Sequence, residues 1–158
     1  MHNLNSNGVI ILDFGSQYTQ LIARRVREFN VFSEILPPDS SIQDILERRP
    51  KALILSGGPS SVYETTAPKY DQDIFKLEIP ILGICYGFQL MVHYYGGIVE
   101  SSSHGEYGFA QVKIEESNGL FHQVSPETEV WMSHMDRVDR IPEDWIVTSH
   151  SSNGVIGS

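Results

Sequence analysis

Short apolar segments separated by polar ones constrain the fold of this chain more than any other feature. Three are apolar runs, Val9–Leu12, Ala52–Leu55 and Pro80–Ile84, and Val31–Leu36 is a fourth expected strand, which contains Ser33 and Glu34. Continuous apolar runs of this length are typical of strands that are buried on both faces of a parallel sheet. The sequence therefore predicts four parallel strands within its first hundred residues.

Helical patterns follow these runs. The expected helices cover Gln17–Phe29, Ser41–Arg48, Tyr70–Leu77 and Tyr86–Tyr95. In the first of them, apolar side chains recur at helical spacing and arginines occupy the other side. A Gly96-Gly97 pair is expected to end the last one. Strands that alternate with helices in this way predict an α/β fold, doubly wound and flavodoxin-like, with a mostly parallel sheet and right-handed crossovers.

The pattern changes after Gly97. Short strands without helices are expected at Ile98–Glu100, Phe109–Ile114, Glu129–Met132 and Trp145–Ser149. Because no linker separates this part from the rest, it is interpreted as an antiparallel extension of the same domain. We predict an N-terminal tail at residues 1–8 and one domain at residues 9–158, incomplete at its C-terminus because the chain stops within an apparent strand.

Composition excludes several classes of protein. With 158 residues, 41% hydrophobic and 20% charged, the chain is an ordinary globular domain. Its net charge of −9 argues against binding to nucleic acid or to anionic membranes. A single cysteine fits a reducing compartment, and the polar start and short apolar runs predict neither secretion nor a membrane anchor. We therefore expect a cytoplasmic protein.

The one cysteine, Cys85, lies between two glycines in Gly83–Gly87, with an apolar strand before it and a helix after it. This is the context of a nucleophile elbow, in which a sharp turn presents the central side chain at the carboxyl edge of the sheet. The helix N-terminus is expected to lower the pKa of the thiol. The alternative is a buried cysteine that acts as a small hydrophobe, which the elbow disfavours.

An attack by Cys85 on a carbonyl group requires donors for the developing oxyanion. The elbow offers the backbone N–H of Tyr86, and the glycine turn Ser56–Pro59 offers that of Gly58. Gln89 lies one helical turn beyond Cys85 and is a candidate for binding the substrate. The competing interpretations are a plain glycine turn for Ser56–Pro59 and an ordinary polar helix-edge residue for Gln89.

Three other motifs are misleading. Ser56–Ser61 resembles the SGGxDS loop of ATP pyrophosphatases but lacks its aspartate, and Asp13–Gly15 matches a kinase triplet without the other kinase motifs. His104, two residues before Glu106, forms the only HxE and is a weak candidate for the catalytic base. The remaining histidines show no spacing typical of metal ligands, so no metal site is predicted.

Four stretches carry a resemblance to a known family: Ile11–Glu28, Leu55–Glu64, Gly83–Met91 and Val130–His134. They resemble the class I glutamine amidotransferases, and the GMP synthetase branch in particular. This resemblance implies that Cys85 attacks the side-chain amide of glutamine, that ammonia leaves, and that water hydrolyses the glutamyl thioester. It assigns the oxyanion hole to Gly58 and Tyr86. It assigns glutamine binding to Gln89 and to a turn formed by Ser133 and His134.

The resemblance also implies partners. Ammonia would pass to an ATP pyrophosphatase domain of the same enzyme, which uses ATP and Mg²⁺ to convert XMP to GMP, while the amidotransferase domain needs no cofactor. The full-length enzyme is expected to be a homodimer. The triad histidine and glutamate of the family are expected beyond Ser158, so the fragment is expected to turn over little glutamine.

Two departures from the family pattern weaken individual assignments. Met135 stands where the family usually has glycine, and His104-Gly105 replaces a charged pair. Two other functions remain open. One is a cysteine hydrolase that acts on another small amide or a glutamyl peptide with the same fold. The other is a noncatalytic interaction module, because a thiolate without a base cannot cycle efficiently.

Overall fold

The computed structural model describes residues 7–116 and 119–158, with side chains except those of residues 102–106 and 133–135. The chain divides into two compact units, Met1–Met91 and Val92–Ser158, which are considered separately. We call them the first and the second unit. Within the described residues, no helix is long and apolar enough to cross a membrane.

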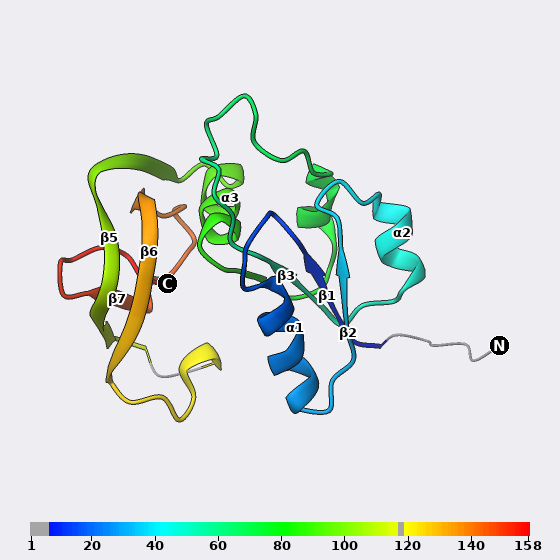
Figure 1. Cartoon of the computed structure of the whole chain (residues 1–158), viewed down its shortest axis with the longest axis horizontal. Coiled ribbons are helices and arrows are strands. Elements are labelled where there is room, and N and C mark those ends of the chain that lie inside the picture. The colour runs from blue at the N-terminus through cyan, green and yellow to red at the C-terminus, as the bar shows by residue number, and fades with distance from the viewer. Residues whose placement is uncertain (1–6, 117–118) are drawn as a thin grey trace. The chain divides into compact units, whose positions relative to one another are not determined.

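The first unit contains a sheet of four parallel strands (Figure 1). These are β1 (Val9–Leu12), β2 (Ser33–Leu36), β3 (Ala52–Leu55) and β4 (Ile81–Gly83), in the order β2-β1-β3-β4. The parallel sheet and its flavodoxin-like order confirm the prediction. In register, Leu12 pairs with Leu36 and with Leu55, and Leu55 pairs with Gly83. The loops that leave β1, β3 and β4 therefore start from one edge of the sheet.

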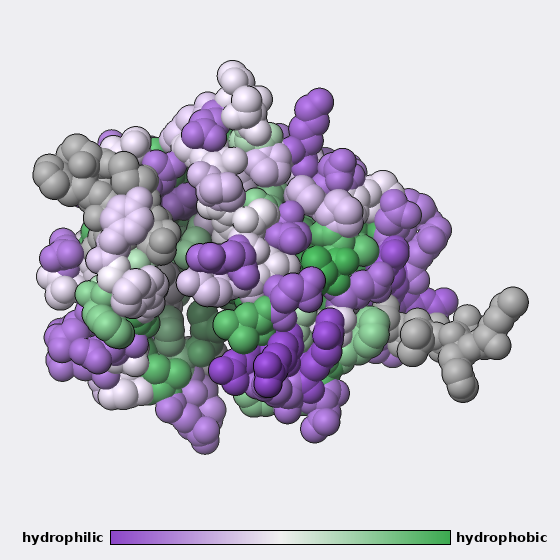
Figure 2. Space-filling view, in the orientation of Figure 1, coloured by the Kyte–Doolittle hydropathy of each residue, from purple (hydrophilic) through white to green (hydrophobic). Residues whose placement is uncertain are grey.

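Helices α1 (Thr19–Glu28) and α2 (Ile42–Glu47) connect the strands, and α3 (Tyr86–Tyr94) follows β4. The apolar side of α1 packs against the sheet in a cluster of Ile11, Ala23 and Ile54. Its outer side carries arginines, and Figure 2 shows strongly hydrophilic side chains gathered over this helix. The apolar pattern of the sequence identifies this face only in part: Ile22 and Val26 pack against the cluster, whereas Leu21 is 45% exposed and the flanking Tyr18 and Phe29 are also exposed.

The helix predicted at Tyr70–Leu77 is wrong in type and extent. The segment forms a 3-10 helix, η1, over Gln72–Lys76. The side chain of Asp71 accepts a hydrogen bond from the N–H of Asp73 at 3.0 Å, which caps a tight turn, and Leu77 is already extended. Such turns seldom continue beyond a few residues, because the hydrogen-bond geometry of a 3-10 helix is poorer than that of an α-helix.

The end of α3 confirms the predicted role of the glycine pair. Gly96 has a φ of +86°, and its N–H donates to the carbonyl of His93 at 3.2 Å. The N–H of Gly97 donates to the carbonyl of Val92 at 2.8 Å. These two bonds form a Schellman motif, for which a left-handed glycine is the preferred residue.

The second unit contains an antiparallel sheet of three strands (Figure 1). The strands are β5 (Ile98–Ile114), β6 (Glu127–Arg140) and β7 (Ser149–Ser151), in the order β6-β5-β7. A short 3-10 helix, η2 (Gly119–Phe121), precedes β6 although no helix was expected there. The predicted antiparallel pairing is confirmed.

The lengths of these strands differ from the prediction. The expected short strands up to Met132 are parts of β5 and β6, which continue through polar stretches, with shifts in their pairing register between Ile98 and Val99 and between Ser101 and Glu106. The strand expected at Trp145–Ser149 is wrong, because Trp145 closes a turn by donating its N–H to the carbonyl of Pro142 at 3.1 Å. Ile146 is 76% exposed, so its apolar character does not mark a buried strand.

Candidate active site

Cys85 occupies a strained turn between β4 and α3. Its φ is +49°, in the left-handed region that is uncommon for residues other than glycine. A Cβ atom on Gly83 would lie 2.6 Å from the Cα of Phe88, and one on Gly87 would lie 2.3 Å from the carbonyl oxygen of Leu55. Both positions therefore require glycine for space. The strained central residue and the two flanking glycines confirm the predicted sharp turn from strand to helix, which is the backbone geometry that a nucleophile elbow requires.

The electrostatics of the thiol differ from the expectation. Cys85 is exposed, yet the surrounding atoms exclude enough water that desolvation raises the pKa of its thiol above the ordinary value. The predicted lowering of this pKa is wrong. Desolvation disfavours the charged thiolate and so raises the pKa of the thiol. A thiol whose pKa is raised is mostly protonated, so it would need a base to remove its proton before it could act as a nucleophile.

The loop after β3 lies beside the elbow. A Cβ atom on Gly57 would lie 3.4 Å from the Cβ of Cys85, in ordinary van der Waals contact. A Cβ atom on Gly58 would lie only 2.3 Å from the carbonyl oxygen of Phe14, so there is no room for a side chain between Gly58 and the backbone that follows β1. Among the described residues, the backbone N–H groups of Gly58 and Tyr86 donate to no other group. Both N–H groups are therefore available to an incoming oxygen atom.

Ser56 connects the three loops at this edge and was not recognised in the sequence. Its side chain is fully buried. Its Oγ accepts a hydrogen bond from the N–H of Phe14 at 2.9 Å and donates one to the carbonyl of Gly57 at 2.8 Å. Its own carbonyl accepts the N–H of Gly87 at 3.1 Å. A serine in a glycine turn gives no sequence signal of this role, because the same residues form ordinary turns.

Aromatic side chains pack around Tyr86, the residue that follows Cys85 in the elbow. Tyr86 is 2% exposed, and its ring lies 5.3 Å from that of Phe14, which in turn lies 6.3 Å from that of Tyr70. Desolvation, followed by the nearby Tyr70 and Glu64, raises the pKa of Tyr86. The phenol of Tyr86 therefore stays protonated, and the residue contributes packing through its ring.

Gln89 is placed one helical turn beyond Cys85, as expected. Its backbone N–H donates to the carbonyl of Cys85 at 3.0 Å, and its side chain is only 7% exposed. Burial of an amide inside a helix-sheet layer requires polar partners. Its role in binding a substrate stays a prediction.

Ser133 and His134 do not form the expected turn. Both lie within β6, where Ser133 pairs with Tyr107 and His134 pairs with Glu106 of β5. Their side chains, and that of His104, lie outside the described residues. The turn that the resemblance implied is wrong, because this stretch continues β6 and pairs with β5. The proposed role of this pair in binding glutamine stays a prediction.

One histidine–carboxylate pair was missed in the sequence. Nδ1 of His150 lies 3.1 Å from Oε1 of Glu115, at the point where β7 pairs with β5. The two residues are 35 positions apart, so only the strand pairing brings them together. It belongs to the second unit and is a partly exposed ion pair when His150 is protonated.

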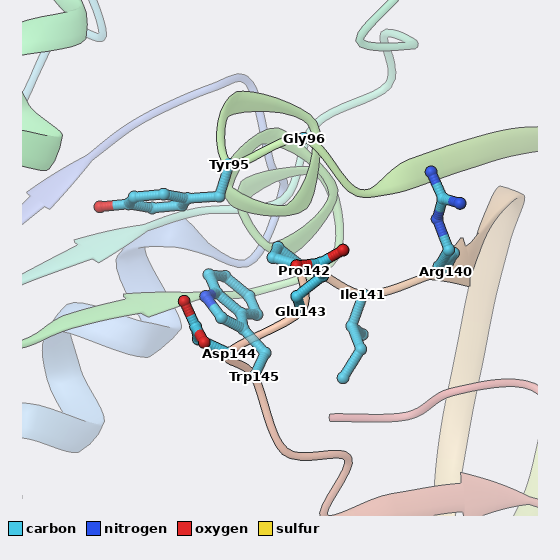
Figure 3. A pocket seen from close by; sticks show the side chains of 8 residues that line it. All are labelled: Tyr95, Gly96, Arg140, Ile141, Pro142, Glu143, Asp144 and Trp145. Atoms are coloured by element: carbon cyan, nitrogen blue, oxygen red, sulfur yellow. The ribbon is translucent and has the colours of Figure 1, made fainter.

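The second unit also has a pocket of about 450 Å³ (Figure 3). It is lined by Tyr95, Gly96, and the run from Arg140 to Trp145. The rings of Tyr95 and Trp145 lie 5.6 Å apart. None of the predicted site residues lines this pocket, and it has no cysteine nucleophile. Within residues 7–116 and 119–158, no cluster of three or more histidine, cysteine or acidic side chains could hold a metal ion.

Proteins named GMP synthase are among the relatives of this chain. The chain is 52% identical over 145 residues to a GMP synthase [glutamine-hydrolyzing] of Campylobacter jejuni, and 51% identical over 152 residues to the Bacillus subtilis protein of that name. These alignments cover 92% and 95% of this chain but only 28% and 30% of those proteins. The chain thus spans less than a third of the length of these relatives.

Solved structures share the fold. A Thermoplasma acidophilum protein described as a GMP synthase subunit superposes with a TM-score of 0.80 at 28% identity, covering 94% of this chain and 75% of that one. A Thermotoga maritima glutamine amidotransferase superposes with a TM-score of 0.73 at 22% identity, covering 95% and 70%. Residues 10–157 match the sequence model of the family described as glutamine amidotransferase class-I. The chain belongs to the class-I glutamine amidotransferase family.

Proposed function

We propose that this chain is the glutamine-hydrolysing part of a GMP synthase, with Cys85 as its nucleophile. The observation that carries the proposal is the strained Cys85, held beside Gly57 at the carboxyl edge of the sheet. Identity of 51–52% to proteins named GMP synthase supports the choice of substrate. Glutamine is therefore the amide whose hydrolysis the site is proposed to catalyse.

The chemistry follows from the donors around the thiol. A base removes the thiol proton, the sulfur attacks the side-chain carbonyl carbon of glutamine, and the oxygen becomes negatively charged. The N–H groups of Gly58 and Tyr86, which are free within the described residues, stabilise that charge. The C–N bond then breaks, the nitrogen takes up the proton and leaves as ammonia, and a glutamyl thioester remains. Attack by water releases glutamate and returns the thiol.

The raised pKa of Cys85 makes the base essential to this proposal. A thiol with a raised pKa is almost fully protonated at neutral pH, so attack requires proton transfer to a neighbouring group. We propose that a histidine, oriented by a glutamate, is supplied by polypeptide that follows Ser158 in the longer protein. The 158-residue chain by itself is expected to release little ammonia.

Three residues are proposed to bind the glutamine. Gln89 is the best supported, because its backbone is hydrogen-bonded to Cys85 and its amide is buried close to the elbow. Ser133 and His134 are proposed to contact the amino-acid end of glutamine through their backbone. Their position in β6 means that such contacts come from strand backbone.

The partners are proposed from the relatives. Since the matched GMP synthases are more than three times as long as this chain, the remaining polypeptide is proposed to be an ATP pyrophosphatase domain. That domain would use ATP and Mg²⁺ to activate XMP and would receive the ammonia. A homodimeric, cytoplasmic full-length enzyme is part of the same proposal.

Ammonia release tests the proposal. The full-length protein is assayed with glutamine and with a γ-glutamyl peptide, alongside Cys85→Ala and an exposed control, Thr65→Ala. We expect Cys85→Ala to lose at least about a thousandfold in rate, with glutamine preferred and the control unchanged. Preference for the peptide would instead favour a cysteine hydrolase, and absence of cysteine-dependent turnover would favour a noncatalytic module.

A further inference from the structure

The two proposed oxyanion donors belong to separate loops, so something has to fix their relative orientation. The N–H of Tyr86 is held by α3, whose first turn is fixed by the glycine contacts of the elbow. The N–H of Gly58 belongs to a glycine turn that offers two easily rotated residues in succession. The donor on the glycine turn is therefore the one that needs a lock.

The peptide group between Gly57 and Gly58 carries both the carbonyl of Gly57 and the N–H of Gly58. In a trans peptide these two groups point in opposite directions. The hydroxyl of Ser56 donates to the carbonyl oxygen of Gly57 at 2.8 Å, inside the protein. Holding this oxygen in place therefore fixes the direction of the Gly58 N–H.

The same hydroxyl is itself fixed by its neighbours. Ser56 is fully buried, and its Oγ accepts the N–H of Phe14 at 2.9 Å. This bond occupies an acceptor position of the oxygen and leaves its hydrogen for the carbonyl of Gly57. The backbone of Phe14 also contacts Gly58, and its ring packs on Tyr86 at 5.3 Å. Ser56 thus connects the loop that carries the Gly58 N–H to Phe14, whose ring packs on Tyr86.

We infer that Ser56 is a positioning residue that locks the Gly57–Gly58 peptide with its N–H turned toward the oxyanion of the substrate. The inference rests on the proposed function, because it concerns the oxyanion hole of that reaction. The hydroxyl makes no contact with substrate in this role. It acts through the carbonyl of Gly57, and its loss frees the peptide to rotate.

The expected effect is on the transition state and not on binding. Loss of one oxyanion donor lowers kcat by about 10²–10³-fold in well-studied hydrolases. A rotating peptide keeps the donor in place for part of the time, so we expect Ser56→Ala to lower kcat by about 10–100-fold. KM is expected to change by less than about threefold, because the oxyanion forms only during attack.

The test compares two buried serines in the full-length protein. Ser33 is a matched control, because its Oγ also accepts one hydrogen bond, from Arg27, and donates one, to the carbonyl of Ala23. Ser56→Ala and Ser33→Ala are assayed for kcat and KM by ammonia release, well below the unfolding temperature of each variant. Alkylation by iodoacetamide reports the reactivity of Cys85 without using an oxyanion hole.

We expect Ser56→Ala to lose kcat while KM and the alkylation rate stay close to those of the wild type, and Ser33→Ala to retain kcat. Should Ser56→Ala fail to fold, Ser56→Cys takes its place, because it keeps the size of the side chain and weakens both hydrogen bonds. It is also expected to lower kcat while KM stays close to that of the wild type. A kcat within threefold of the wild type, or an equal loss in Ser33→Ala, overturns the inference. Ammonia release that persists in Cys85→Ala overturns the proposed function instead.

Discussion

The tight contact beneath the elbow makes Gly87→Ala the most informative change for stability. A Cβ atom at this position would lie 2.3 Å from the carbonyl oxygen of Leu55 and 2.7 Å from its carbonyl carbon. Both atoms are backbone in the central sheet, so the neighbour cannot rotate away. Overpacking of this kind costs about 3 kcal/mol, whereas alanine gains about 1 kcal/mol over glycine within a helix. The net loss in the free energy of unfolding is therefore about 2 kcal/mol.

Urea denaturation of the 158-residue chain, followed by circular dichroism, measures this loss. Gly96→Ala is the control, because a Cβ atom there meets nothing within 4 Å and only the φ of +86° opposes the substitution. The cost of that strain is about 1 kcal/mol. Gly87→Ala is expected to be the more destabilising change. A variant with the stability of the wild type would refute the packing of α3 against β3.

Three further predictions concern other parts of the chain. Because the pKa of Cys85 is raised, its alkylation by iodoacetamide should be slower than that of free cysteine at pH 8. The alkylation rate of Cys85 should keep increasing at pH values where that of free cysteine has levelled off. A midpoint of the rate-against-pH curve below that of free cysteine would contradict the raised pKa. The cross-strand rings of Phe109 and Trp131, 5.1 Å apart and exposed, should show a coupling of about 1 kcal/mol in a double-mutant cycle, and additive effects would argue against their contact. Ser41→Ala should destabilise the chain by about 1 kcal/mol through loss of the hydrogen bond to the N–H of Asp44, and an unchanged melting temperature would show that this cap contributes nothing.

The parallel sheet was predictable because its strands are covered on both faces. Strands such as β1 and β3 consist almost entirely of buried aliphatic residues, and this leaves a continuous apolar run in the sequence. The long hairpin of β5 and β6 lacks this signal. Its buried face carries Val112 and Val138, while the exposed face near Trp131 is aromatic, so apolar residues do not mark one face consistently. Short strands were predicted where the structure has long ones.

The proposed nucleophile of the candidate site was predictable from the sequence, whereas the residues that support it were not. Cys85 could be identified because two glycines, an apolar strand and a helix surround it, and each of these has a local sequence signal. The pKa of its thiol depends on how much water the folded loops exclude, which no local pattern reports. Ser56 and Phe14 act through contacts between loops that are far apart in the sequence. Such roles become visible only when the carboxyl ends of the strands are brought together.

The covalent intermediate on Cys85 tests the proposed mechanism most directly. The full-length protein is mixed with glutamine, quenched in acid during turnover, digested and examined by mass spectrometry. The proposed mechanism predicts a glutamyl adduct on the peptide that contains Cys85. This adduct disappears after treatment with hydroxylamine and is absent from Cys85→Ala. Steady release of ammonia by Cys85→Ala, with no adduct on the wild-type peptide, would contradict it.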